Sequence, residues 1–143
     1  MDAAEKSAVL ARLNAWGKNT LLETLSIEFV DVGADFLTAT MPVGPVVHQP
    51  HGILHGGASV ALGESVASTL SNYVIDTQSH YAVGVNIQAN HLRPLHAGVV
   101  RCTAVIKRRG RSMHYSEMTV VDEQERLICA MSMNDMVAAH STS

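Results

Sequence analysis

The stretch that decides the fold runs from Gln49 to Ser68 and reads QPHGILHGGASVALGESVAS. It begins as a loop rich in proline, glycine and histidine, and the pair Gly56 and Gly57 marks the change to helical sequence. No proline follows that pair before Tyr73, so we predict one long helix over residues 57–74.

One carboxylate, Glu64, lies inside this predicted helix. It is the only Asp, Glu, Lys or Arg between Val43 and Ile75. A helix face in water normally carries several long charged side chains. The polar residues on the side of Glu64 are instead short: Ser65, Ser68, Ser71 and Asn72. We interpret this face as a site that something else covers, and the helix as the centre of the fold.

Composition limits the class of protein. A chain of 143 residues that is 47% hydrophobic and 16% charged predicts one domain over 1–143, with an N-terminal helical part at 1–20 and a tail at 139–143. The net charge of -3 indicates no nucleic-acid partner. No apolar run has membrane length, and residues 1–18 lack the apolar segment of a signal peptide, so we expect no membrane partner and a cytoplasmic protein. Cys102 and Cys129 fit small buried residues in a reducing compartment better than a disulfide.

The remaining elements follow from hydrophobic periodicity. Helical spacing predicts a helix over residues 2–16, and alternation predicts a hairpin over 25–32 and 36–41, with Leu37, Ala39 and Met41 on one face. A loop over 42–54 precedes the long helix, and four strands are predicted after it, over 81–93, 99–109, 113–121 and 126–137. In the first of these four, Val83, Val85, Ile87 and Ala89 are expected to share one face. The order predicts an α+β fold in which an antiparallel sheet wraps around one long helix, with a frayed end from His140.

Such a sheet around one helix is the hot-dog arrangement, and the motifs point the same way. Gln49, the run His55-Gly56-Gly57, Glu64 and Ser68 resemble the hot-dog acyl-CoA thioesterases. The resemblance is to the branch that uses a helix glutamate, with the phenylacetate-pathway, 4-hydroxybenzoyl-CoA and 1,4-dihydroxy-2-naphthoyl-CoA thioesterases. Matches at Asn90-His91-Leu92-Arg93 and Gly110-Arg111-Ser112 extend it over residues 22–137.

The glycine pair is suited to polarising a thioester carbonyl. N–H groups at a helix N-terminus are unpaired and lie at the positive end of the dipole. Without a Cβ, Gly56 and Gly57 let an acyl group reach these N–H groups, which can form an oxyanion hole. The alternative is that the two glycines only relieve a tight turn. The resemblance implies that Gly56 is the main donor, that the His55 side chain assists, and that Gln49 contacts the thioester.

The carboxylate can then attack or assist attack. Glu64 is either a nucleophile that forms a mixed anhydride or a base that activates water, and the sequence leaves both open. Ser68 lies one helical turn beyond Glu64 on the same face, where it could hold the carboxylate or the water.

Basic residues gather at one predicted strand turn: Lys107, Arg108, Arg109 and Arg111. They are either a solvated hairpin tip or a clamp for coenzyme A phosphates. The resemblance implies that His91 and Arg93 lie near the nucleotide, and that Gly57, Arg111 and Ser112 also bind substrate. The spacing of His48, His51 and His55 fits no standard zinc motif, so we predict no metal, and hydrolysis needs no cofactor.

These residues predict hydrolysis of a small acyl- or aryl-CoA to the free acid and CoA. The alternatives are an enoyl-CoA hydratase or dehydratase and an acyl-CoA-binding module without activity. The acyl group, and whether CoA or a carrier protein bears it, stay open. Gly56 and Glu64 lie eight residues apart, roughly 12 Å along one helix. We therefore predict a homodimer that shares its active sites, and the resemblance implies that such dimers pair into tetramers.

Overall fold

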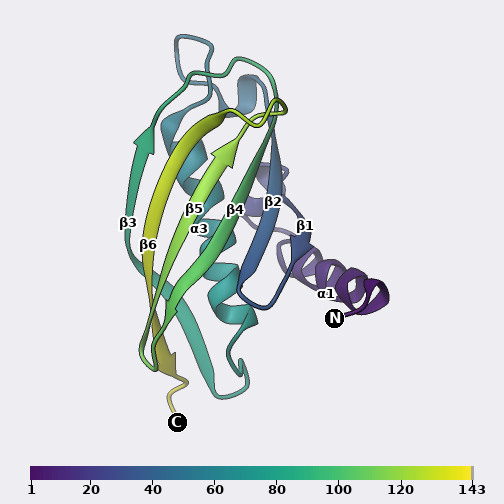
Figure 1. The fold of residues 1–143 in the computed structure, drawn as a ribbon, viewed down its shortest axis with the longest axis vertical. Helices are drawn as coiled ribbons and strands as arrows, with labels where there is room; N and C mark the ends of the chain where they lie inside the picture. Colours follow the sequence, from purple (N-terminus) through teal and green to yellow (C-terminus); the bar gives the residue numbers. More distant parts are fainter. Residues whose placement is uncertain (143) are drawn as a thin grey trace.

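The fold is one sheet laid against one long helix, as the computed structural model of residues 1–142 shows (Figure 1). The helices are α1 (Ala3–Trp16), α2 (Leu21–Thr24), the 3-10 turn η1 (Pro45–Val47) and α3 (Gly56–Tyr73). The strands are β1 (Glu28–Val32), β2 (Phe36–Val43), β3 (His80–His91), β4 (Gly98–Arg109), β5 (Met113–Val121) and β6 (Leu127–Ala139). They form a six-stranded antiparallel sheet in the order β1-β2-β4-β5-β6-β3. The predicted α+β hot-dog fold is confirmed.

The core lies between α3 and the sheet. Leu62, Val66 and Leu70 recur every fourth residue on α3 and are fully buried, which is the spacing of a buried helix face. On β2, Leu37, Ala39 and Met41 are also fully buried, so the predicted inner face of that strand is confirmed. Burial of each leucine side chain contributes about 1.5–3 kcal/mol, which fixes α3 across the sheet.

The N-terminal helix α1 packs beside β1 at one end of the sheet (Figure 1). Asp2 accepts a hydrogen bond from the Glu5 amide while the Glu5 side chain accepts one from the Asp2 amide, a capping box that starts the helix. Asn14 donates to the Phe29 carbonyl and accepts from the Phe29 amide, so α1 is tied to β1. The prediction for residues 2–16 is confirmed, whereas the four-residue helix α2 was not predicted.

Strand β3 departs from the predicted alternation. A bulge between Gly84 and Asn86 shifts its register against β6, and a bulge reverses which side chains face the core. Ala82 is buried before the bulge, and Ile87 and Ala89 pack on the core after it, whereas Val83 and Val85 are exposed. The prediction that all four residues from Val83 to Ala89 share a face is therefore wrong, because the inserted residue changes the phase.

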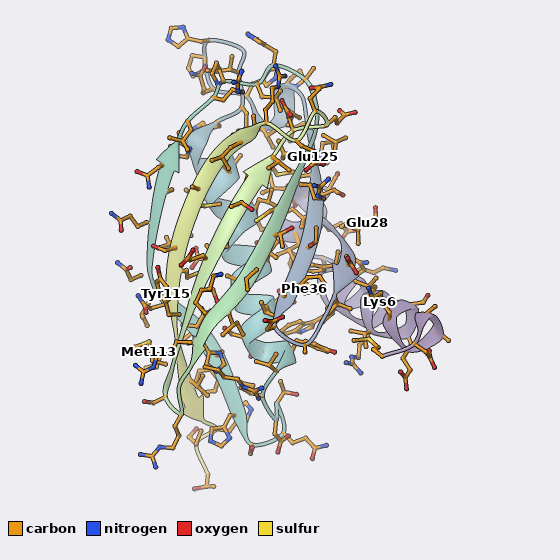
Figure 2. The ribbon with its side chains drawn as sticks, in the orientation of Figure 1. Lys6, Glu28, Phe36, Met113, Tyr115 and Glu125 are labelled. Atoms are coloured by element: carbon orange, nitrogen blue, oxygen red, sulfur yellow. The ribbon has the colours of Figure 1, made fainter. Side chains whose placement is uncertain are left out.

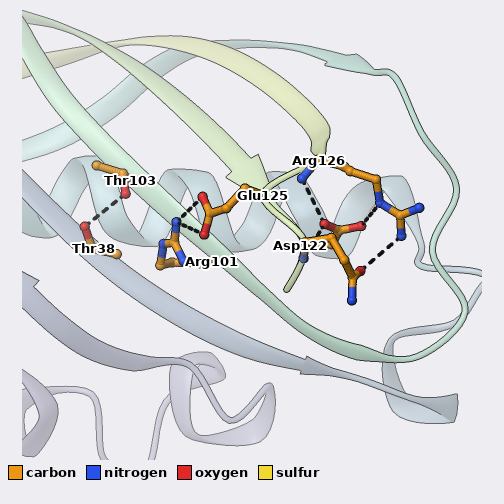
Figure 3. A network of polar contacts seen from close by, with 7 residues as sticks. Thr38, Arg101, Thr103, Asp122, Glu125 and Arg126 are labelled. Atoms are coloured by element: carbon orange, nitrogen blue, oxygen red, sulfur yellow. Dashed lines mark hydrogen bonds and ion pairs between the residues drawn. The ribbon is translucent and has the colours of Figure 1, made fainter.

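Polar contacts pin the turn between β5 and β6 (Figure 3). Buried Asp122 accepts hydrogen bonds from the Gln124 and Arg126 amides and from the Arg126 guanidinium. Burial works to raise the pKa of Asp122, but these hydrogen bonds outweigh it and hold that pKa below its usual value.

The cysteines are free and buried, as predicted. Burial, together with the proximity of Cys129, raises the pKa of the Cys102 thiol to about 12, so it is no nucleophile. The predicted tail differs at its start, because Ala139 still belongs to β6 and His140 donates to the Ser79 carbonyl. The tail's last residue, Ser143, lies outside the described residues. Among those described, no helix combines the length and apolar character needed to cross a bilayer.

Candidate active site

The N-terminus of α3 presents one free amide. His55 caps the helix, and its ring Nδ1 accepts the Gly57 N–H at 2.8 Å. The Gly57 amide is thus occupied, contrary to the expectation that both glycine amides could serve an oxyanion. The Gly56 N–H makes no hydrogen bond to any of residues 1–142. With Nδ1 as acceptor, a neutral His55 ring carries its proton on Nε2, which is then a side-chain donor.

A cavity of about 390 Å³ opens beside this helix end. Its lining includes four predicted site residues, Gln49, Gly56, His91 and Arg93, together with Ile53, Leu54, Ser59, Leu92, Pro94 and Ile128. The His91 ring lies over Gly56, since a Cβ on Gly56 would be 2.9 Å from its Nε2. Within one chain, His91 therefore borders the expected oxyanion donor, whereas the resemblance implied the nucleotide end.

The loop before α3 holds Gln49 in this lining. The Gln49 amide donates to the Ile53 carbonyl at 2.9 Å, and the His55 amide donates to the Val47 carbonyl at 2.8 Å. The side-chain Oε1 of Gln49 accepts the His51 amide. Its side-chain NH2 is then the group that can donate to a thioester oxygen or sulfur.

Glu64 is exposed in the isolated chain and lies against the bulge in β3. A Cβ on Gly84 would be 2.7 Å from Glu64 Oε1, so with any larger residue there the Glu64 carboxylate would have to shift. Asn72 fixes this part of β3 to the helix, because its side chain exchanges two 2.9 Å hydrogen bonds with the backbone of Ala82. The Ser68 hydroxyl donates to the Glu64 main-chain carbonyl at 2.7 Å rather than to the carboxylate, and the alternative that Ser68 holds the attacking water stays a prediction.

Arg111 and Ser112 lie at the opposite end of the molecule, in the turn between β4 and β5. The neighbouring Arg109 guanidinium donates to the carbonyl of Val74, the C-cap of α3. The same end is marked in Figure 2 by Met113 at the start of β5. An 18-residue helix spans about 27 Å. One chain therefore holds the predicted residues in three places: the start of α3, the middle of α3 and the basic turn.

The sequence reasoning missed a buried polar cluster next to Glu64. Ser71, His114 and Asp135 are all 0 or 1% exposed, and His114 and Asp135 each form a hydrogen bond to the Ser71 hydroxyl. A signal existed, because Asp135 continues the inward alternation of Cys129, Met131 and Met133 along β6. A charged residue at an inward position of a strand is rarely placed there for stability alone.

Comparison with known proteins identifies the family of this chain. The Thioesterase superfamily matches residues 51–129. The proofreading thioesterase EntH of Cronobacter turicensis is 38% identical over 133 residues, which cover 93% of this chain and 96% of that protein. A mutant of thioesterase PA1618 from Pseudomonas aeruginosa has a crystal structure that matches with a TM-score of 0.90 at 37% identity, covering 92% of this chain and 94% of that one. Thioesterase HI1161 from Haemophilus influenzae matches with a TM-score of 0.88 at 35% identity, covering 91% of this chain and 90% of that one.

The family match covers more than half of this chain, and the alignment with EntH covers 93% of it. The six-stranded sheet and its long helix match the fold of these structures. The chain therefore belongs to the thioesterase superfamily, and it is a thioester hydrolase with the hot-dog fold.

Proposed function

We propose that the chain hydrolyses a small acyl- or aryl-CoA thioester to the free acid and CoA, with Glu64 driving the attack and Gly56 stabilising the oxyanion. The observation that carries the proposal is the free Gly56 N–H at the start of α3, inside a cavity that also holds Gln49 and His91. Two buried cysteines without a disulfide suit a reducing compartment, so we place this activity in the cytoplasm.

The start of α3 supplies the electrostatic part of catalysis. As the thioester carbonyl is attacked, negative charge develops on its oxygen, and the positive end of the helix dipole favours that charge. The Gly56 N–H and the His55 Nε2–H can both donate to it. A single donor of this kind typically lowers the barrier by about 3 kcal/mol. The NH2 of Gln49 can hold the thioester before the attack.

Glu64 supplies the attack in one of two ways. As a base, it takes a proton from water while the water oxygen bonds to the carbonyl carbon. As a nucleophile, its own oxygen forms that bond, and water later hydrolyses the mixed anhydride. In both routes the carbon–sulfur bond breaks, CoA leaves as its thiolate, and the thiolate takes up a proton.

Two chains are needed to bring these groups together. Gly56 and Glu64 are about 12 Å apart along α3, whereas donor and attacker must both reach one carbonyl. A two-fold dimer with antiparallel α3 helices would set Gly56 of one chain beside Glu64 of the other. The edge strand β3 suits such pairing, since its backbone edge is free and it exposes Tyr81, Val83 and Val85. We further propose that two such dimers form a tetramer.

The same arrangement gives the basic turn a function. An antiparallel partner would bring its Arg111 and Ser112 from the C-terminal end of α3 toward the Gly56 end of the first chain. Arg93 already lines the cavity there. A guanidinium from each chain could then bind coenzyme A phosphates through paired N–H groups.

A panel of acyl-CoA and aryl-CoA substrates tests the proposal through release of free thiol. Glu64→Gln keeps the shape of the side chain but removes its charge, so we expect kcat to fall by at least about 100-fold. Glu117→Gln is the matched control, because Glu117 is exposed on β5 away from the cavity. A Glu64→Gln enzyme that keeps more than a tenth of wild-type kcat at unchanged KM rules out the role. Enoyl-CoA and a binding assay in the same panel separate hydrolysis from hydration and from binding alone.

A further inference from the structure

A buried cluster of polar side chains lies next to Glu64 and comes from α3, β5 and β6. The Ser71 hydroxyl on α3 donates to Asp135 Oδ2 on β6 at 2.7 Å. His114 Nδ1 on β5 lies 3.1 Å from the same hydroxyl oxygen. Since the Ser71 proton is given to Asp135, His114 must donate its Nδ1–H to Ser71. The order of donation therefore runs from His114 through Ser71 to Asp135.

One carboxylate oxygen in this polar cluster has no hydrogen-bond partner among the described residues. That oxygen is Oδ1 of Asp135, which is 0% exposed. A buried carboxylate oxygen without a donor is costly, and protonating it removes most of that cost. Because Oδ2 already accepts from Ser71, the proton belongs on Oδ1.

The unpartnered oxygen and the Glu64 carboxylate border the same space. Gly84 stands opposite Asp135 in the pairing of β3 with β6. A Cβ placed on Gly84 would be 2.7 Å from Glu64 Oε1 and 3.6 Å from Asp135 Oδ1, and 2.4 Å from the Met133 methyl carbon. The missing side chain of Gly84 thus lets both carboxyl groups lie beside this strand together with the Met133 methyl group, and a proton on Oδ1 can be donated to Glu64 through one water.

The ionisable groups around Asp135 come from three elements, and the cation among them, Arg109, lies on β4, two strands away from Asp135 on β6. Glu64 faces it from α3, His114 stands opposite it on β5, and Arg109 on β4 stands opposite His114. Burial, and then the charge of Arg109, lower the pKa of His114, so this ring stays neutral and supplies no counter-charge. Burial raises the pKa of Asp135, and the charge of Glu64 adds to the rise against the opposing hydrogen bond from Ser71.

We propose that Glu64 and Asp135 form a carboxyl pair that holds one proton, which rests on buried Asp135 while exposed Glu64 carries the negative charge. Asp135 is then a positioning residue for the attacking carboxylate, and this inference rests on the role proposed above for Glu64. In the single chain water reaches Glu64 and is excluded from Asp135, which favours the negative charge on Glu64. The donated proton orients the Glu64 carboxylate and keeps a second negative charge out of the site.

The pair predicts a coupled titration that does not depend on activity. With the aspartate side-chain carboxyls labelled with carbon-13, the resonance missing in Asp135→Asn identifies Asp135, and its shift is followed against pH. In Glu64→Gln the opposing charge is gone, so the Asp135 midpoint moves to lower pH than in the wild type. In Ser71→Ala a stabilising donor is gone, so the midpoint moves to higher pH. An Asp135 midpoint that is the same in the wild type and in Glu64→Gln overturns the pair, whatever the enzyme hydrolyses.

Kinetics separate positioning from a purely structural role. Asp135→Leu removes the donor to a charged group, for which a loss of at least about 10-fold in kcat/KM is expected. Asp135→Asn keeps an N–H donor, so it should stay within about threefold of the wild type, because hydrogen-bonding capacity is retained. Asp135→Asn cannot ionise, so it should also lose the fall of kcat/KM that a second charge causes in the wild type at high pH.

A second buried aspartate is the control. Asp122 is 2% exposed and paired with Arg126 at the far turn. Asp122→Asn should lower the unfolding temperature without changing the pH profile of kcat/KM. Equal losses in Asp135→Leu and Asp135→Asn, with an unchanged pH profile in the latter, would make the cluster a structural feature and refute the positioning role. Inactivity of the wild type toward every thioester would instead count against the proposed function, while the nuclear magnetic resonance titration still decides whether the pair exists.

Discussion

Shared active sites can be tested by mixing two inactive chains. Glu64→Ala removes the attacking group, and Gly56→Pro removes the free N–H. Proline is well suited to this position, because Gly56 is the first residue of α3 and His55 before it has an extended ψ of 130. The substitution thus deletes one donor at little cost to the helix backbone. The exposed His91 ring must shift, since the new Cβ would be 2.9 Å from its Nε2.

The expected recovery follows from the geometry. If each site takes Gly56 from one chain and Glu64 from the other, a heterodimer of the two variants holds one intact site and one doubly damaged site. Random pairing of equal amounts makes half of the dimers mixed, so activity per chain should return to about a quarter of the wild type. If one chain supplied both groups, no site in the mixture would be intact, and activity would stay at the level of the parents.

The assay is thiol release after the variants are unfolded together and refolded, with native mass spectrometry to show that heterodimers form. The converse experiment mixes wild type with a chain that carries both Gly56→Pro and Glu64→Ala. If the sites are shared, both sites of a mixed dimer are damaged, and activity per chain falls to about a quarter of the wild type. If each site lies within one chain, every wild-type chain stays active, and about half of the activity remains. Heterodimers that form but restore nothing would refute the reasoning from the 12 Å separation along α3, a value of about eight helical rises.

Two further predictions concern binding and stability. Arg111→Ala should raise KM for an acyl-CoA several-fold with little change in kcat, since a phosphate contact is equal in the ground and transition states. The matching acyl-pantetheine, which lacks the nucleotide, should be unaffected, and equal losses on both substrates would assign Arg111 another role. Leu70→Ala should lower the free energy of unfolding by about 3 kcal/mol in urea, because Leu70 is fully buried between α3 and the sheet. Val46→Ala is the control, since Val46 is 80% exposed, and a change above about 0.5 kcal/mol there would show that the comparison measures something other than burial.

The centre of the fold was predictable because it is encoded locally. A run without proline, a glycine pair at its start and one isolated carboxylate were enough to predict α3 and to single out Glu64. Alternation on β2 predicted its inner face, because side chains two residues apart in a strand point the same way. Each of these signals lies within a few residues along the chain.

The surroundings of Glu64 were not predictable, because they depend on pairing between distant strands. The bulge at Gly84 cannot be read from alternation, since the valines on both sides of it preserve an apolar pattern. Its effect is to reverse the phase of β3 and to set a residue without a side chain between Glu64 and Asp135. Likewise, the sequence does not distinguish the Gly57 amide from the Gly56 amide, whereas in the structure the Gly57 N–H donates a hydrogen bond to the His55 ring.

The isolation of Glu64 in the sequence and its exposure in the structure point to one explanation. A functional carboxylate needs a site that excludes bulk water, yet in the single chain Glu64 is open while the polar residues beside it are short. The adjacent edge strand β3 exposes apolar side chains, which is unfavourable for a chain that stays alone. A partner chain across β3 would cover both features at once and would add a free Gly56 amide to the same place. The carboxyl pair then acquires a physical reason, because a covered Glu64 keeps its charge more readily when buried Asp135 keeps the proton.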